Sequence, residues 1–199
     1  MRIGIFGGTF SPIHNGHVKA ALCFMEKMKL DKLYVIPDNI PPHKVISSSD
    51  DPNIRFEMTK LAFCGIDKVE VSDIELLRKG KSFTVDTLPA FADEGELFLL
   101  CGTDMFLSFD TWHRFEDIFK LCTLVLIPRD FPDEKTREEI EMKNRIYKEI
   151  YGAKTEIIDA TPFPISSTEI CRMIKNGEDY SMYVPKKIHD FIEERGLYR

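Results

Sequence analysis

Short apolar segments alternate with longer segments of helical periodicity along the chain, and this alternation limits the folds that are possible. The run Leu124-Val125-Leu126-Ile127 is almost continuously apolar, as expected of a parallel strand that is buried on both faces. The pattern predicts an α/β fold, an open and mostly parallel sheet with helices on both faces. We expect strands at 2–6, 33–36, 68–72, 96–101, 122–127 and 154–159, and helices at 15–29, 52–64 and 133–151.

The chain of 199 residues is long enough for one domain with a real core. We expect that domain to span 1–199, with a helical part from about residue 166 packed on the sheet. Gly177 is typical of a helix end and Pro185 of a helix start. Residues 37–52 form a polar loop, and loops of that length are often functional or mobile. The apolar face of the helix at 15–29 is expected to hold Val18, Ala21, Leu22 and Met25.

The composition is that of a soluble globular protein and disfavours two classes of partner. Hydrophobic residues make up 43% and the formal net charge is −6, whereas nucleic-acid binding usually needs a basic stripe. No apolar run approaches the length of a membrane span, and the first residues enter a strand without a signal-peptide pattern. The cysteines form no C-x-x-C pair, which suits a reducing cytoplasm. We expect core thiols at Cys23, Cys64, Cys101 and Cys122.

The first part of the chain carries the strongest chemical signal. An apolar strand runs into Gly7-Gly8-Thr9, and His14 and His17 follow at the start of an amphipathic helix. Glycines let the backbone approach a ligand closely, and the N–H groups of a helix N-terminus point at an anion. Imidazoles beside them can donate hydrogen bonds to a phosphoryl oxygen. The glycines miss the G-x-G-x-x-G dinucleotide spacing, and zinc needs more ligands than two histidines, so we expect a phosphate site.

Residues 7–17 resemble the G-G-T-F-D-P-I-H-x-G-H motif of the nucleotidylyltransferase superfamily and, more narrowly, of the bacterial nicotinate-nucleotide adenylyltransferases. Ser11 stands where that family usually has Asp. The resemblance implies a Rossmann-like fold, catalytic contacts from His14 and His17 to the phosphates, with His17 nearest the α-phosphate, and ATP contacts from Gly7, Gly8, Thr9 and Phe10.

The segment after the last expected strand, Ile165-Ser166-Ser167-Thr168-Glu169-Ile170, is a good helix N-cap box. It is also similar to the I-S-S-T-x-I-R element of the family, whose helix N-terminus and arginine hold the ATP phosphates. The resemblance thus implies ATP contacts from Ile165, Ser166 and Ser167. The arginine position is Cys171 here, and Arg172 follows. A shift of one residue turns the side chain by about 100 degrees, so either Arg172 or another cation takes that role.

Two more elements resemble family sites that bind ATP or substrate phosphate. Gly102-Thr103-Asp104 ends a strand and begins a helix, where an Asp can simply cap the helix. In the family, the matching Asp accepts hydrogen bonds from the adenosine ribose. Lys44 lies in the Pro41-Pro42-His43-Lys44 element, whose Lys reaches substrate phosphate in the family.

Two elements point to the acceptor. The only Trp, Trp112, precedes His113, and in the family the matching Trp stacks on the pyridine ring. Thr84 lies in a segment similar to S-Y-T-x-x-T-L, whose backbone N–H groups bind the nicotinate carboxylate together with those near the Trp. Arg55, which resembles a family Arg, and Arg129 are either site residues or plain surface charges.

The resemblance implies transfer of the adenylyl group of ATP to nicotinate mononucleotide, giving nicotinate adenine dinucleotide and pyrophosphate in NAD synthesis. Mg²⁺ is expected on the triphosphate, held mostly by phosphates and water, so we name no protein ligand for it. Three alternatives remain open: a phosphopantetheine acceptor, nicotinamide mononucleotide as a second acceptor, and a non-catalytic nucleotide sensor. A nicotinamide-dependent oxidoreductase is disfavoured by the missing fingerprint. The oligomeric state is not encoded in any visible pattern, and a homodimer stays open.

Overall fold

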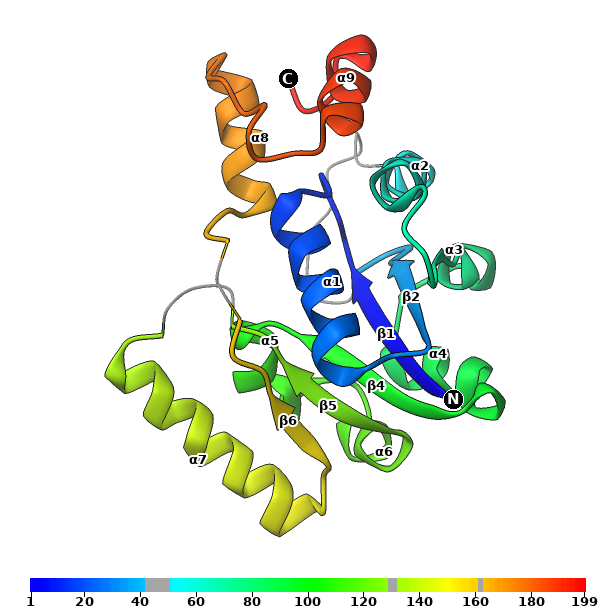
Figure 1. Ribbon diagram of the computed structural model, residues 1–199, viewed down its shortest axis with the longest axis vertical. Coiled ribbons are helices and arrows are strands. Elements are labelled where there is room, and N and C mark those ends of the chain that lie inside the picture. Colours follow the sequence, from blue (N-terminus) through cyan, green and yellow to red (C-terminus); the bar gives the residue numbers. More distant parts are fainter. Residues whose placement is uncertain (42–50, 129–131, 161–162) are drawn as a thin grey trace.

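The computed structural model describes residues 1–41, 51–128, 132–160 and 163–199, and its framework is one twisted parallel sheet (Figure 1). The strands are β1 (Arg2–Gly8), β2 (Lys32–Pro37), β3 (Val69–Val71), β4 (Glu96–Cys101), β5 (Cys122–Leu126) and β6 (Thr155–Ile157). They lie in the order β3-β2-β1-β4-β5-β6, and all neighbours pair in parallel. The predicted strands and the α/β class are therefore confirmed.

Helices connect the strands and cover both faces of the sheet. They are α1 (Asn15–Met28), α2 (Pro52–Phe63), α3 (Ile74–Arg78), α4 (Thr84–Thr87), η1 (Leu88–Glu94), α5 (Thr103–Leu107), η2 (Phe109–Thr111), α6 (Phe115–Leu121), α7 (Glu134–Tyr151), α8 (Ser167–Asn176) and α9 (Lys186–Arg195). Local signals explain several ends. Asp51 caps α2 with Pro52 at its first position, and Gly177 ends α8 in the left-handed conformation.

The period of two in each strand divides the core into two apolar clusters, one on each face of the sheet. In β5, Val125 contributes to the cluster beneath α1, α2, α8 and α9, while Leu124 contributes to the one beneath α5, α6 and α7. Ile170 of α8 and Ile188 of α9 are both fully buried in the first cluster. The last two helices thus pack on the same core as the strands, beyond the carboxyl end of β1 (Figure 1).

Two predicted core positions are wrong. Leu22 is 43% exposed, because the buried stripe of α1 runs through Ala21, Phe24 and Met28. Cys64, at the C-terminal end of α2, is exposed, Cys23 is partly buried, and Cys101 and Cys122 are buried. Burial raises the pKa of the Cys122 thiol to about 12, as it does in direction for Cys101.

Candidate active site

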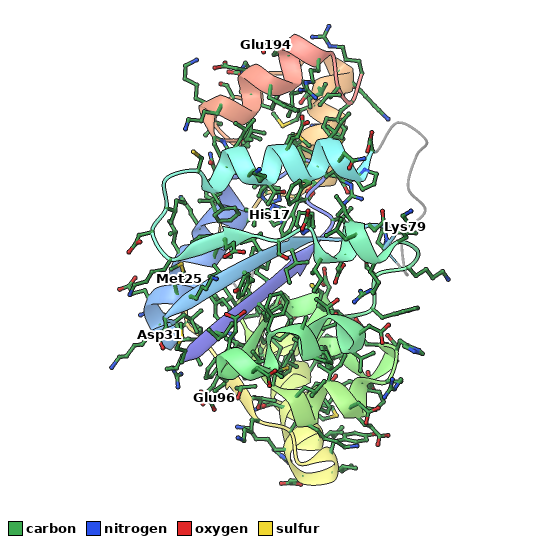
Figure 2. The ribbon with its side chains drawn as sticks, turned by 90° about the vertical axis from the view of Figure 1, so that its right-hand side faces the viewer. His17, Met25, Asp31, Lys79, Glu96 and Glu194 are labelled. Carbon is green, nitrogen blue, oxygen red and sulfur yellow. The ribbon has the colours of Figure 1, made fainter. Side chains whose placement is uncertain are left out.

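A cavity of about 1190 Å³ opens at the carboxyl ends of the strands. This is the edge of an open parallel sheet where ligands bind. Its walls come from the ends of β1 and β4, the N-terminal parts of α1 and α8, and the segment that includes α4. Figure 2 shows His17 well apart from Asp31 and Glu96, which lie where β1 and β4 begin.

The two histidines sit at the N-terminus of α1, and both line the cavity. His14 is the N-cap residue, and its backbone N–H donates to Nδ1 of His17 at 3.3 Å. Their rings are stacked with centroids 3.6 Å apart. Because Nδ1 of His17 accepts a hydrogen bond, the neutral imidazole carries its proton on Nε2. Nε2–H of His17 is therefore a potential hydrogen-bond donor to an anion, and it lies beside the N-terminus of α1.

Aromatic packing holds the His17 ring. Phe10 has a left-handed φ of 50° and is 2% exposed. Its ring meets those of Phe6 and His17 edge-on, at centroid distances of 5.2 and 5.1 Å. The ring of Phe10 is thus buried in the core. Only the backbone of Phe10 remains to contact a ligand in the cavity. Gly7 and Gly8 lie just before it on the cavity wall, with Thr9.

Gly16, which the sequence analysis did not single out, packs tightly between the histidine pair and the segment before α8. A Cβ at this position would lie 3.0 Å from the His14 ring and 3.4 Å from the carbonyl oxygen of Phe163. A side chain here would push on the catalytic candidates, which explains the glycine. Its place between the two histidines was the available signal.

Arg55 is not a surface charge, as the structure buries it completely. Its guanidinium donates to the carbonyl oxygens of Thr9 at 2.8 Å and Asn39 at 3.0 Å, and to Oδ1 of Asp38 at 2.9 Å. Asp38 in turn accepts from the Thr9 hydroxyl at 2.9 Å. This buried ion pair connects the loop after β1 to the loop after β2, and so shapes the end of the cavity beside Thr9.

Asp38 is a site residue that the sequence analysis missed. Its carboxylate faces the cavity wall next to Thr9. The available signal was its position directly after the carboxyl end of β2, where polar side chains of a parallel sheet gather.

The predicted acceptor residues Thr84, Trp112 and His113 come together on the same cavity wall. Trp112 is partly buried and stacks on Phe109 at 4.8 Å, which leaves part of the indole accessible. His113 lies against Phe83, with ring centroids 4.5 Å apart. The backbone N–H of Trp112 already donates to Phe109, so that particular group is engaged within the protein.

Glu75, also missed from the sequence, supports the turn that carries Thr84. It is 8% exposed, and its Oε1 accepts from the hydroxyl of Thr87 at 2.6 Å. Burial raises the pKa of the Glu75 carboxyl, and hydrogen bonds from Thr87 and Ser82 oppose that shift. A buried acid thus holds α4 in place at the cavity edge.

The start of α8 forms the opposite wall. Oγ of Ser166 accepts the Glu169 backbone N–H at 3.1 Å, and Oγ of Ser167 donates to the carbonyl oxygen of Pro12 at 3.0 Å. The helix-capping interpretation of this segment is confirmed. Both serines and Ile165 also line the cavity, which is the position that the ATP-site prediction requires.

Arg172 does not reach the cavity. It is exposed and donates to the carboxylates of Glu169 and Glu178, at 2.8 and 2.7 Å. These carboxylates raise the pKa of the guanidinium above its usual value. The cavity-lining residue is Cys171. The physical reason is the turn of about 100 degrees between adjacent helical residues, which moves Arg172 onto the solvent side.

The two departures from the family motif lie in contact. Sγ of Cys171 is 3.7 Å from the carbonyl oxygen of Ser11. Ser11 replaces the acidic residue of the motif and Cys171 the basic one. The contact is to the Ser11 backbone, while the Ser11 hydroxyl donates to Tyr198 at 3.3 Å. Relative to the motif, the two replacements together remove one acidic and one basic side chain.

The remaining predicted site residues fall into two groups. Gly102 is the N-cap of α5, and Asp104 lies exposed in the first turn, both on the cavity wall. Asp104 is therefore not the cap, and its carboxylate is presented toward the cavity. Lys44 and Arg129 lie outside the described residues.

In the part of the chain that the structure describes, no three His, Cys, Asp or Glu side chains gather in a group that could hold a metal ion. Nor does that part contain a helix of the length and apolarity needed to cross a membrane.

Comparison with known proteins places the chain in a family. The cytidylyltransferase-like family pattern matches residues 5–173. A probable nicotinate-nucleotide adenylyltransferase of Clostridium botulinum is 36% identical over 98% of both chains, and so is one of Clostridium tetani. The nicotinic acid mononucleotide adenylyltransferase of Plasmodium falciparum, solved with APC, superposes with a TM-score of 0.74 at 17% identity, covering 99% of this chain and 96% of the other.

The Plasmodium enzyme solved with NaAD superposes with a TM-score of 0.73 at 17% identity, covering 99% of this chain and 97% of the other. At that identity the likeness shows the shared fold alone, while the clostridial relatives and the family pattern carry the assignment. The chain therefore belongs to the nicotinate-nucleotide adenylyltransferases, within the cytidylyltransferase-like family.

Proposed function

We propose that this protein transfers the adenylyl group of ATP to nicotinate mononucleotide. The observation that carries the proposal is a large cavity that joins the proposed phosphate end, at His14 and His17, to an aromatic end, at Trp112. Its volume of about 1190 Å³ exceeds the usual range for one drug-sized ligand. Two substrates can therefore lie side by side with their phosphates between the two ends.

The reaction is a direct in-line displacement. A 5′-phosphate oxygen of nicotinate mononucleotide attacks the α-phosphorus of ATP, the bond from that phosphorus to the bridging oxygen breaks, and pyrophosphate leaves. Such transfers require mainly positioning and charge stabilisation. Nε2–H of His17 donates to the charge that grows on the α-phosphate, while the N-terminus of α1 adds its dipole. The packing of Phe10 keeps the imidazole in this orientation.

Mg²⁺ enters as part of the substrate, bound to the triphosphate. The carboxylate of Asp38 is engaged with Arg55 and Thr9, so phosphate oxygens and water are the better ligands for a cation that keeps much of its hydration. The ribose of the adenosine has its own candidate partner. Asp104, exposed on the cavity wall, is placed to accept hydrogen bonds from the ribose hydroxyls.

The acceptor end selects the pyridine ring by stacking and by its substituent. The accessible part of Trp112 supplies the platform. Backbone donors at the start of α4, at Thr84, favour a carboxylate over an amide, whose NH₂ would face those donors. The cysteines favour a location in the cytoplasm. Cys101 and Cys122 are buried free thiols, and free thiols are typical of proteins in a reducing compartment.

The test is pyrophosphate release from ATP and Mg²⁺ with nicotinate mononucleotide, nicotinamide mononucleotide and phosphopantetheine in parallel. We expect fast turnover with the nicotinate compound and at most slow turnover with the other two. Faster turnover with another acceptor would keep adenylyl transfer and overturn the assigned acceptor. ATP binding without pyrophosphate release in any of the three reactions would support a nucleotide sensor instead.

A further inference from the structure

One face of α8 lines the nucleotide cavity, and it carries a cation that the family motif does not predict. Cys171 and Lys175 are both on the cavity wall. Residues four apart in a helix lie on the same face, one turn after the other. Arg172 lies off this face, in its surface pairs with Glu169 and Glu178.

The charge of Lys175 is available to a ligand. Within the described ranges, the Lys175 ammonium group forms no ion pair with a carboxylate and donates no hydrogen bond to another residue. Two other cations of the cavity wall are engaged. The Lys19 ammonium lies 4.1 Å from the centre of the Phe163 ring, and Arg199 donates to Glu193 at 2.8 Å.

Lys27 also lines the cavity, but it lies far along α1 from the phosphate end. Ten residues separate it from His17, which corresponds to about 15 Å of helix. By contrast, Lys175 is one turn from Cys171, whose Sγ lies 3.7 Å from the Ser11 carbonyl oxygen. Of Lys27 and Lys175, Lys175 is therefore the lysine placed closer to the glycine- and histidine-rich segment.

The direction of helical side chains brings the Lys175 ammonium toward the start of α8. Long side chains in a helix lean back over the preceding turn, and here that turn carries Cys171. Cysteine is small and leaves this surface open for a lysine side chain. This lean moves the ammonium group toward the N-terminus of α8, whose backbone N–H groups can bind an anion.

We propose that Lys175 binds the triphosphate of ATP and supplies the positive charge that Cys171 lacks. The inference rests on the proposed function in taking the anion to be ATP. An ammonium group suits this role because it binds phosphate as a point charge and needs no fixed fork geometry. A side chain one turn away can therefore replace a guanidinium.

The test compares the affinities of AMP, ADP and ATP for wild type, Lys175→Met and Lys27→Met by titration calorimetry. We expect Lys175→Met to bind ATP about tenfold more weakly and AMP within about twofold of wild type. Lys27→Met, the matched control at a distant part of the cavity wall, should bind all three as wild type does. Equal losses for AMP and ATP, an unchanged ATP affinity, or equal effects of both variants would overturn the assignment.

A second variant keeps the result independent of small structural changes. Cys171→Arg added to Lys175→Met should restore most of the ATP affinity, because it returns a cation to the same face. In turnover, Lys175→Met should raise KM for ATP and leave KM for nicotinate mononucleotide unchanged. Since the affinity measurements need no acceptor, a lack of turnover would overturn the proposed function while leaving the assignment of Lys175 to be judged by binding.

Discussion

The N-termini of α1 and α8 face the same cavity, but the protein holds their functional groups in different ways. At α1 the partly buried His17 lies beside His14, which is 4% exposed, and Phe10, which is 2% exposed, while Arg55 of α2, at 0% exposed, holds the loop at Thr9 by a hydrogen bond. At α8 the candidate cations Arg172 and Lys175 are exposed. Where the chemistry needs a donor in one orientation, burial fixes it. Where it needs only charge, a flexible side chain from a neighbouring turn is sufficient.

The largest expected effect comes from breaking the buried support of the α1 end. Arg55→Met should destabilise the protein by about 3–5 kcal/mol, because it leaves the Asp38 carboxylate buried without its cation. Chemical denaturation measures this free energy. Arg145→Ala, an exposed arginine on α7, is the control and should change it by less than about 0.5 kcal/mol. A small effect of Arg55→Met would show that the two ends are held alike.

The next effect is on catalysis alone. His17→Ala should lower turnover by about a hundredfold or more, because one preorganised donor to the α-phosphate is lost. Pyrophosphate release measures the rate, and circular dichroism checks that the fold is intact. His189→Ala on α9 serves as a control for loss of an imidazole elsewhere. Near-normal turnover of a folded His17→Ala enzyme would remove His17 from the mechanism.

A subtler change tests how tightly the histidine pair is fitted. Gly16→Ala places a Cβ 3.0 Å from the His14 ring, and a small displacement of catalytic groups is costly. We expect turnover to fall about tenfold with little change in stability. Leu22→Ala, on the exposed face of α1, controls for a side-chain change in the same helix. If Gly16→Ala were fully active, the pair would be more adaptable than its packing indicates.

The two family departures should behave as a coupled pair. Ser11→Asp alone and Cys171→Arg alone each add one uncompensated charge where Sγ of Cys171 lies 3.7 Å from the Ser11 carbonyl. Either should shift the apparent ATP affinity several-fold, and the double variant should return toward wild type. A double-mutant cycle on KM for ATP measures the coupling. Strict additivity would show that the two positions do not interact energetically and would contradict the coupling.

The smallest effect is expected at Arg172. Arg172→Ala should change KM for ATP by less than about twofold, because the guanidinium forms exposed ion pairs with Glu169 and Glu178 and not with a ligand. The same kinetic assay measures it beside Lys175→Met. A larger rise in KM for Arg172→Ala than for Lys175→Met would reverse the roles assigned on α8.

Much of the fold followed from the sequence because its signals are local. Hydrophobic period and length identified the strands, including the buried run of β5. Capping chemistry located the starts of α2 and α8 at Asp51 and Ser166. That the glycines and the two histidines would lie together was also predictable, since a strand, two glycines and two histidines follow one another within a single segment, and they line one cavity.

Tertiary structure alone decided which distant side chains meet. The burial of Arg55 depends on the loops after β1 and β2 lying side by side, and the contact of Cys171 with Ser11 joins residues far apart in the chain. Leu22 and Arg172 each lie on the solvent side of a helix because neighbouring elements set how that helix is rotated. The sequence by itself determined the elements and the local order of glycines and histidines in the segment that lines the cavity. Packing determined which charges are buried, paired or available, because those depend on long-range neighbours that no local pattern encodes.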